Sequence, residues 1–141
     1  MAASTPRSVR LSGQARNVSG IPDLGETSDV AVVVVGTDVA EGVLTGRFDF
    51  VDHGVISAAG HLHVERILTQ GDDTIDMEIE ADFGDETATT QTVSGRWTIR
   101  SGTGAYENLR GSGSIVATVT KASPHSISET LDGFASFNPS N

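Results

Sequence analysis

The sequence predicts an all-β protein of antiparallel strands, either a sandwich or a barrel, and three observations carry this prediction. About eight short apolar runs are separated by turn residues. No segment shows the sustained 3.6-residue apolar repeat of an amphipathic helix. The chain has 16 glycines, which disfavour helices. Its 141 residues suffice for one domain with a core and are too few for two, so we expect a single domain over residues 1–141.

The first half of the chain contains four predicted strands, at Val9–Val18, Asp29–Gly36, Leu44–Val51 and Gly60–Thr69. The second of these is apolar on both faces, so both faces should be covered. The third alternates strongly and places Phe48 and Phe50 on the face of Leu44. Ile21–Gly25 is a predicted loop and Asp52–Gly54 a predicted turn.

The second half begins with the clearest strand, Thr74–Phe83, after a hairpin turn at Gln70–Asp73. Its odd-numbered residues are apolar and four of its even-numbered residues are carboxylates, so a one-residue slip would bury four charges. The later elements are a loop at Gly84–Thr87, a strand from Val93 to Arg100, strands at Ser114–Thr120 and Ile127–Phe137, a break at Pro124, and frayed tails at 1–7 and 138–141.

Composition excludes several classes of function. The formal net charge of −10 repels nucleic acid and anionic membranes, so we expect neither as a partner. The chain has no cysteine, which rules out disulfides, thiolate catalysis and cysteine-ligated zinc. The first residues contain no apolar signal segment, and the longest apolar run, Val30–Val35, is far too short to span a bilayer. We therefore expect a cytoplasmic protein.

Residues 97–113, WTIRSGTGAYENLRGSG, combine the end of an alternating strand with a glycine-rich turn and the start of another strand. This segment resembles the hallmark of the allene oxide cyclase-like and dirigent-like barrels, which place a similar GTGxYxxxxGxG turn between two late strands. The resemblance implies a closed antiparallel β-barrel of about eight strands, wide enough to hold one small ligand. The spacing of the predicted strands extends the likeness to most of the chain.

The resemblance also implies an activity and an assembly. Bacterial members of this barrel group include spirotetronate cyclases, which catalyse an intramolecular [4+2] cycloaddition in polyketide biosynthesis. Plant members cyclise an unstable epoxide or orient phenoxy radicals, and their catalytic residues match no position here. The family commonly forms homodimers or homotrimers, and such an interface would cover the outer face of Asp29–Gly36.

The first candidate site pairs Arg66 with Glu129. Arg66 shares a strand face with Leu62, Val64 and Leu68, which we take as the inner one, and Glu129 lies on the apolar face of the last strand. A buried guanidinium needs an anion, and a desolvated carboxylate has a raised pKa suited to acid–base catalysis. The alternative is that a local bulge turns one of these side chains outward.

A second candidate is the set of large side chains Phe48, Phe50, Phe83, Trp97, Tyr106, Phe134, Phe137 and Met77. These residues could line an apolar ligand site, or they could simply fill the barrel. Tyr106 is the best candidate for a functional phenol because it projects from the turn near a barrel mouth. Its alternative role is to lock that turn by hydrogen bonding.

A third candidate is His61, His63 and Glu65, which lie at i, i+2 and i+4 of one strand and therefore share a face. Two imidazoles and a carboxylate could bind a divalent metal. The alternative, which we favour, is a polar solvated face opposite Leu62, Val64 and Leu68. We expect no metal and no cofactor.

The sequence contains neither a nucleophile elbow nor a phosphate-binding loop, and its Asp and Glu residues are predicted on solvent faces. Together with this absence of standard motifs, the resemblance implies a cofactor-independent cyclase or isomerase of natural-product biosynthesis, which we predict holds a flexible hydrophobic substrate in a reactive fold. The predicted catalytic residues are Tyr106, Arg66 and Glu129, and the predicted substrate-binding residues are Trp97, Phe48, Phe50, Met77 and Phe83. A donor such as Tyr106, Arg66 or the Trp97 N–H would polarise a carbonyl. The alternatives are a barrel that binds a small hydrophobic ligand without turnover and an interaction barrel with a filled interior.

Overall fold

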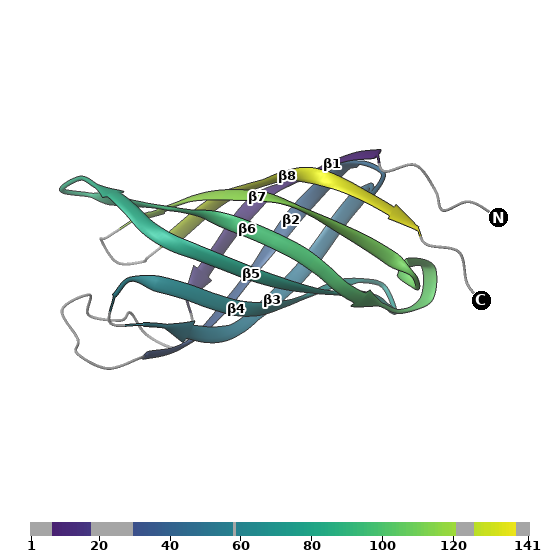
Figure 1. The fold of residues 1–141 in the computed structure, drawn as a ribbon, viewed down its shortest axis with the longest axis horizontal. Coiled ribbons are helices and arrows are strands. Elements are labelled where there is room, and N and C mark those ends of the chain that lie inside the picture. Colours follow the sequence, from purple (N-terminus) through teal and green to yellow (C-terminus); the bar gives the residue numbers. More distant parts are fainter. Residues whose placement is uncertain (1–6, 18–29, 58, 121–125, 138–141) are drawn as a thin grey trace.

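The computed structural model describes residues 7–17, 30–57, 59–120 and 126–137. Within these residues eight antiparallel strands form a closed barrel in which each strand pairs with the next and β8 pairs with β1 (Figure 1). The strands are β1 (Arg7–Asn17), β2 (Val30–Gly42), β3 (Gly46–Ile56), β4 (His61–Gln70), β5 (Asp73–Glu86), β6 (Thr90–Gly102), β7 (Leu109–Thr120) and β8 (Ser126–Phe137). The prediction of an all-β closed barrel is confirmed.

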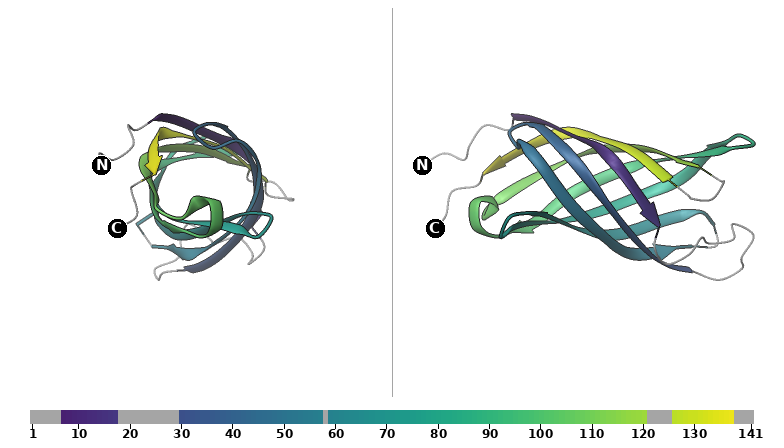
Figure 2. Two further views of the ribbon diagram at one scale, coloured as in Figure 1. Left: turned by 90° about the vertical axis from the view of Figure 1, so that its right-hand side faces the viewer. Right: turned by 180° about the vertical axis from the view of Figure 1, so that it is seen from behind.

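The two ends of the barrel differ. A single 3₁₀ turn, η1 (Gly104–Tyr106), follows β6, and we call the end at which it lies the η1 end. The described chain also begins and ends there, and Figure 2 shows the ring of strands from this side. The opposite end, where β1, β3, β5 and β7 finish, is called the far end. At the η1 end the strands are joined by short turns and by η1. The longer connections begin at the far end.

The interior follows the alternation of each strand. In β5 the odd-numbered residues from Ile75 to Ala81 are buried, as the sequence pattern predicted, and the carboxylates point outward. The largest side chains that are less than 2% exposed are Trp97, Phe48, Phe50, Leu11, Leu68, Ile75, Met77, Ile79, Leu109, Leu131 and Asp38. These side chains are almost completely removed from solvent, so the barrel interior is packed where they lie.

Trp97 is placed by a glycine on another strand. Its indole Nε1 donates a hydrogen bond to the carbonyl oxygen of Ser114, at 3.0 Å. A Cβ atom at Gly133 would lie 2.6 Å from Cζ2 of Trp97 and 2.2 Å from the carbonyl oxygen of Ser112. Because only glycine avoids both contacts, Gly133 allows the side chain of Trp97 to lie against β8.

Several boundaries differ from the sequence prediction. The predicted turn Asp52–Gly54 is wrong, because these residues continue β3. Asp52 points inward to an ion pair, and Gly54 permits a close approach to β4, where a Cβ would lie 2.1 Å from the carbonyl oxygen of His63. Leu44 is buried in the β2–β3 turn rather than in a strand, and β7 begins at Leu109, earlier than the predicted Ser114.

Other predictions meet mixed outcomes. Phe134 is not part of the interior. The odd-numbered residues of β8, such as Leu131 and Ala135, face inward, so Phe134 faces outward and is 61% exposed. β2 continues to Gly42 and β5 to Glu86, beyond the predicted ends of these strands. The expected loop Ile21–Gly25, the break at Pro124 and the expected tails lie outside the described residues, except for Arg7, which opens β1.

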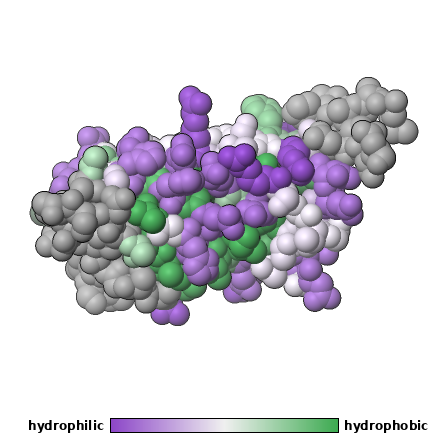
Figure 3. Space-filling model, turned by 60° about the horizontal axis from the view of Figure 1, so that its bottom comes forward, coloured by the Kyte–Doolittle hydropathy of each residue, from purple (hydrophilic) through white to green (hydrophobic). Residues whose placement is uncertain are grey.

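The outer face of β2, β3 and β4 carries an apolar stripe, formed by Val33, Val35, Val51, Val55 and Ile67. Val35 pairs with Val51, and Val51 pairs with Ile67, so the stripe crosses three neighbouring strands. Figure 3, which brings the underside of Figure 1 forward, shows a hydrophobic region across the middle of this face. The prediction that residues 29–36 are apolar on both faces therefore holds for the described part, with Val32 and Val34 on the inner face.

Among the described residues, no helix has the length and apolar character that crossing a lipid bilayer would require.

Candidate functional site

The most unusual feature of the interior is an ion pair that spans the lumen. Arg66 on β4 and Glu129 on β8 stand on opposite sides of the ring, with three strands between them in either direction. Nη1 and Nη2 of Arg66 donate to the two carboxylate oxygens of Glu129, the second of these bonds at 2.8 Å. The predicted inward pair of Arg66 and Glu129 is thus present, and neither strand bulges to turn one of them outward.

Two further carboxyl groups complete the cluster. Nε and Nη2 of Arg66 donate to the two oxygens of Asp52 on β3, at 2.7 and 2.9 Å. Nη1 also donates to Oδ2 of Asp38 on β2, at 3.3 Å. A guanidinium has five N–H groups, and these five hydrogen bonds use all of them. We call Arg66, Asp38, Asp52 and Glu129 the lumen cluster.

The lumen cluster is almost completely removed from solvent. The side chains of Arg66, Asp38, Asp52 and Glu129 are between 0% and 6% exposed. The guanidinium carbon of Arg66 also lies 3.7 Å from the centre of the Phe50 ring, a cation–π contact that covers one face of the charge. A single cation thereby ties four of the eight strands together across a dry interior.

The pKa values in the cluster are pulled apart. Burial and the neighbouring negative charge of Glu129 raise the pKa of Asp38 to about 8. Burial would also raise the pKa of Glu129, but the charge and hydrogen bonds of Arg66 outweigh it, and the pKa of Glu129 is lowered. Burial raises the pKa of Asp52, and Arg66 offsets part of this rise. Burial lowers the pKa of Arg66, yet Asp52 and Glu129 more than offset it, so Arg66 stays charged.

These shifts fix the protonation of the cluster at neutral pH. Asp38 is mainly neutral there, and it shares a hydrogen bond with Glu129. Because Glu129 is ionised, the proton of that bond belongs to Asp38. A neutral acid and an ionised carboxylate in contact, inside a dry lumen, form the kind of pair that can exchange a proton with a bound molecule.

Asp38 has room in the cluster because its partner on β1 is a glycine. Gly13 pairs with Asp38 on one side and with Glu129 on the other. A Cβ atom at Gly13 would lie only 2.5 Å from Oδ1 of Asp38. This Oδ1 atom is buried and accepts no hydrogen bond. The missing side chain of Gly13 therefore leaves space for the carboxyl group of Asp38, but one oxygen of that group has no hydrogen-bond partner.

The sequence prediction found half of this cluster. Asp38 and Asp52 were missed, and the expectation that Asp and Glu residues all face solvent is wrong for them. Asp52 has the same parity as Phe48 and Phe50, so continuing their alternation by one step would have placed it inside. Asp38 faces inward like Ala40, but it lies beyond Gly36, the predicted end of its strand, so the sequence pattern did not assign it to a face.

Tyr106 is held at the η1 end. Its hydroxyl donates to Oε1 of Gln70, and its ring packs against Phe48 with centroids 5.5 Å apart. The backbone N–H of Tyr106 also bonds the carbonyl oxygen of Thr103 within η1. These contacts match the alternative role of Tyr106 as the residue that locks the turn. The side-chain partners lie on β3 and β4, the strands of Asp52 and Arg66, but nearer to the η1 end than the lumen cluster.

The predicted substrate-binding residues divide into two groups. Phe48, Phe50, Met77 and Trp97 are fully buried in the packed part of the interior. Phe83 is partly exposed near the far end, with Phe137 partly exposed at the η1 end. Phe50 touches the lumen cluster directly through its ring.

The lumen changes character on the far-end side of the cluster. On the η1 side, the inner positions next to it carry Phe50, Leu68, Met77 and Leu131. On the far-end side, small residues occupy inner positions on five strands, namely Ala15, Gly54, Ala81, Gly95 and Ala117. Beyond them stand partly buried apolar residues, namely Val34, Leu62, Phe83, Val119 and Ile127. Small inner residues are thus frequent directly beyond the lumen cluster on the far-end side, although Val32, Ile56, Val64 and Val93 are also buried there.

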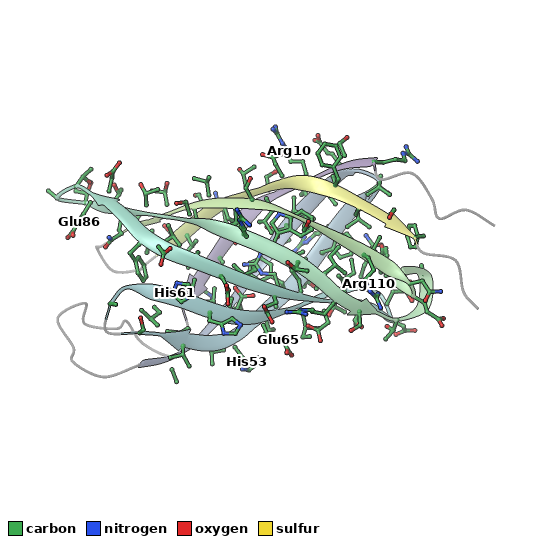
Figure 4. All side chains as sticks on the ribbon, in the orientation of Figure 1. Arg10, His53, His61, Glu65, Glu86 and Arg110 are labelled. Carbon is green, nitrogen blue, oxygen red and sulfur yellow. The ribbon has the colours of Figure 1, made fainter. Side chains whose placement is uncertain are left out.

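The histidine motif lies on the outside of the barrel. His63 and Glu65 are exposed, and Leu62, Val64 and Leu68 face inward, as the alternative interpretation predicted. Figure 4 shows His61 and Glu65 at separate points of β4, with His53 on β3 beside Glu65. His61 pairs through Nδ1 with Asp82, at 2.8 Å.

The candidate metal trio of His61, His63 and Glu65 is not the set that converges. The ligand atoms of His63, Glu78 and Glu80 lie within 4.8 Å of one another instead, because β5 runs beside β4 and pairs Glu80 with His63. Glu78 also accepts a hydrogen bond from Arg100. Exposed groups of this kind are common on charged strands, and this arrangement fits a solvated face as well as a cation site.

No protein-family model matches this chain, and neither the curated proteins nor the solved structures include a match.

Replacing Arg66 by methionine should strongly destabilise the fold, because three buried carboxyl groups would lose the cation to which all three bond. We expect the free energy of unfolding, measured with urea, to fall by about 3–5 kcal/mol or the chain not to fold. Arg10→Met is the matched control, since its pair with Asp132 is exposed and should cost at most about 1 kcal/mol. Equal losses in the two variants would contradict the structural role of the cluster.

Asp38→Asn should remove a specific pH dependence of stability. Between its ordinary value of 3.8 and about 8, Asp38 is protonated in the folded state and ionised in the unfolded state. The unfolded state therefore binds fewer protons, and the stabilising contribution of Asp38, complete below this range, is lost as pH rises through about 8, by up to about 1.4 kcal/mol per pH unit.

Urea unfolding of the native chain and of Asp38→Asn at pH values from 5 to 9 measures this contribution. The unfolding free energy of the native chain minus that of Asp38→Asn should fall as pH rises from 5 to about 8 and then level off. Two curves that run parallel over the whole range would show that Asp38 does not carry the proton.

Proposed function

We propose that this protein binds one small, mostly apolar molecule in the far-end half of the barrel lumen and promotes its cyclisation or isomerisation without a cofactor. The observation that carries the proposal is the proton-sharing pair of Asp38 and Glu129 beside an inner surface of small apolar residues. A barrel of eight strands is wide enough for one such molecule. The resemblance of residues 97–113 to cyclase barrels agrees with this function.

The proposed chemistry is acid–base catalysis by the carboxyl groups. The three donors suggested by the sequence are already engaged, because Tyr106 donates to Gln70, Trp97 to Ser114, and Arg66 to the three carboxyl groups. Polarisation of a carbonyl by these donors would require breaking an existing bond. We therefore assign the removal of a proton to Glu129 as base. Once Glu129 has taken that proton, the proton held between Asp38 and Glu129 can return to the molecule with Asp38 as acid, and Arg66 positions both groups.

The second candidate function is binding without turnover. The observation that favours it is the completeness of the Arg66 hydrogen bonds, since a cluster satisfied in this way also serves a purely structural role. Both candidates use the same lumen, and they differ in whether the bound molecule is changed.

Catalysis is tested by incubating the purified protein with linear polyene precursors that carry a reactive end group and following the rate and stereochemistry of cyclisation. We expect acceleration by the native chain and a loss of about a hundredfold in Asp38→Asn, compared at pH 6, where Asn replaces a neutral carboxyl group. His61→Ala, on the outer face, should leave the rate unchanged. Binding without any change in rate or product would favour the second candidate, and neither binding nor turnover would exclude both.

We also propose that copies of the chain associate as a homodimer or homotrimer through the apolar stripe on β2, β3 and β4, and that the protein works in the cytoplasm. Val33, Val35 and Ile67 are only partly exposed, and Val55 is 40% exposed, so a second copy would remove further apolar surface from water. Light scattering should give a mass of two or three chains, and Val55→Lys should shift it towards one chain. A single-chain mass for the native protein at high concentration would exclude this assembly.

A further inference from the structure

The lumen cluster has no hydrogen-bond donor left to offer. Arg66 contributes five N–H groups, and all five bond to carboxyl oxygens within the cluster. The remaining proton, on Asp38, is shared with Glu129. A molecule that reaches the cluster therefore meets only oxygen atoms.

Acceptor capacity, by contrast, is in excess. The three carboxyl groups provide six oxygen atoms, each able to accept more than one hydrogen bond, against six donated protons. One of the six oxygens, Oδ1 of Asp38, accepts no hydrogen bond at all. With Arg66 charged and Asp38 neutral, Asp52 and Glu129 leave the cluster with excess negative charge.

The rest of the far-end lumen adds no competing polar site. Inner positions there carry Ala, Gly, Val, Leu, Ile and Phe, and the described polar exception is Gln91, whose Nε2 donates to the carbonyl oxygen of Gly84. Asp52 is followed on β3 by Gly54, and Glu129 pairs with Ala117 on β7, so both carboxyl groups border small inner positions of the far-end half. We therefore place the polar end of a molecule in this half against these two carboxylates.

We propose that the molecule bound in this lumen carries a hydrogen-bond donor, a hydroxyl or an amine, at the end that meets Asp52 and Glu129, and that molecules ending in a carboxylate or a bare ether are rejected. The inference rests on the proposed function, because it names the class of ligand for the same lumen. A donor group gains a charge-assisted bond to an acceptor, whereas an acceptor group loses its water and finds no partner. A carboxylate would additionally meet like charge.

A pair of isomers tests this inference without any effect of overall charge. 1-Decanol and methyl nonyl ether have the same formula and similar shape, and only the alcohol can donate. Each is titrated against the native protein loaded with the neutral fluorescent probe N-phenyl-1-naphthylamine. We expect the alcohol to displace the probe at about one tenth of the ether concentration, the ratio for one hydrogen bond to a charged group. Decanoate should be weaker than both.

Two matched variants locate the binding. Ala117→Leu fills an inner position of the far-end half, and Val116→Leu changes the neighbouring residue, whose side chain is exposed outside the barrel. Probe binding should fall at least tenfold in the first variant and stay unchanged in the second. If both variants bind equally, the ligands lie outside the lumen and the inference is overturned.

The outcomes separate this inference from the function on which it rests. Lumen binding in which the ether equals or exceeds the alcohol, or in which decanoate binds best, overturns the donor rule and leaves the binding function intact. No binding of the probe or of any of the three ligands to the folded native protein overturns both.

Discussion

The structure depends most on the charge of Arg66 and the three carboxyl groups around it. A buried guanidinium is costly to desolvate, and here its five N–H groups all find acceptors on β2, β3 and β8. The same bonds fix the relative positions of four strands, so the cluster sets the register of the barrel interior as well as its charge. Gly13 follows from this requirement, because a Cβ atom there would lie 2.5 Å from Oδ1 of Asp38, whereas Gly54 allows β3 to approach the backbone of β4.

The cluster also divides the lumen. On its η1 side, large side chains and Phe50 fill the barrel, and Tyr106 locks the end through Gln70. On its far-end side, alanines and glycines are frequent at the inner positions, with partly buried apolar residues beyond them. One half thus provides the packing that keeps a small barrel stable, and the other half is the part in which we place binding. Asp38 lies at the boundary between the two halves. Its proton contributes to the stability of the fold and is also the one that we propose for catalysis.

Much of this arrangement could be predicted from the sequence, and the failures have definite causes. The strand of residues 73–86 could be assigned to its faces because a slip would bury four carboxylates. Arg66 and Glu129 could be paired because each interrupts an apolar face. Asp52 was assigned to a turn because Asp, His and Gly in succession are typical of one. In the structure these residues continue a strand, where Asp52 bonds to Arg66 of β4 and the backbone of β4 lies too close for any residue larger than glycine at position 54. Phe134 was misplaced because a single aromatic residue was given more weight than the parity of its strand.

The sequence by itself determined the strand class, the inward faces and the absence of thiol chemistry, because each is a local property of residue types and their spacing. The tertiary structure alone decided which charges meet. Asp38, Asp52 and Arg66 lie on the neighbouring strands β2, β3 and β4, and Asp52 pairs directly with Arg66. Glu129 on β8 reaches them only because the ring closes β8 onto β1. His63 meets Glu80 because β4 and β5 pair side by side. Closure of a barrel is a long-range constraint, and no local pattern can report which side chains it brings across the lumen.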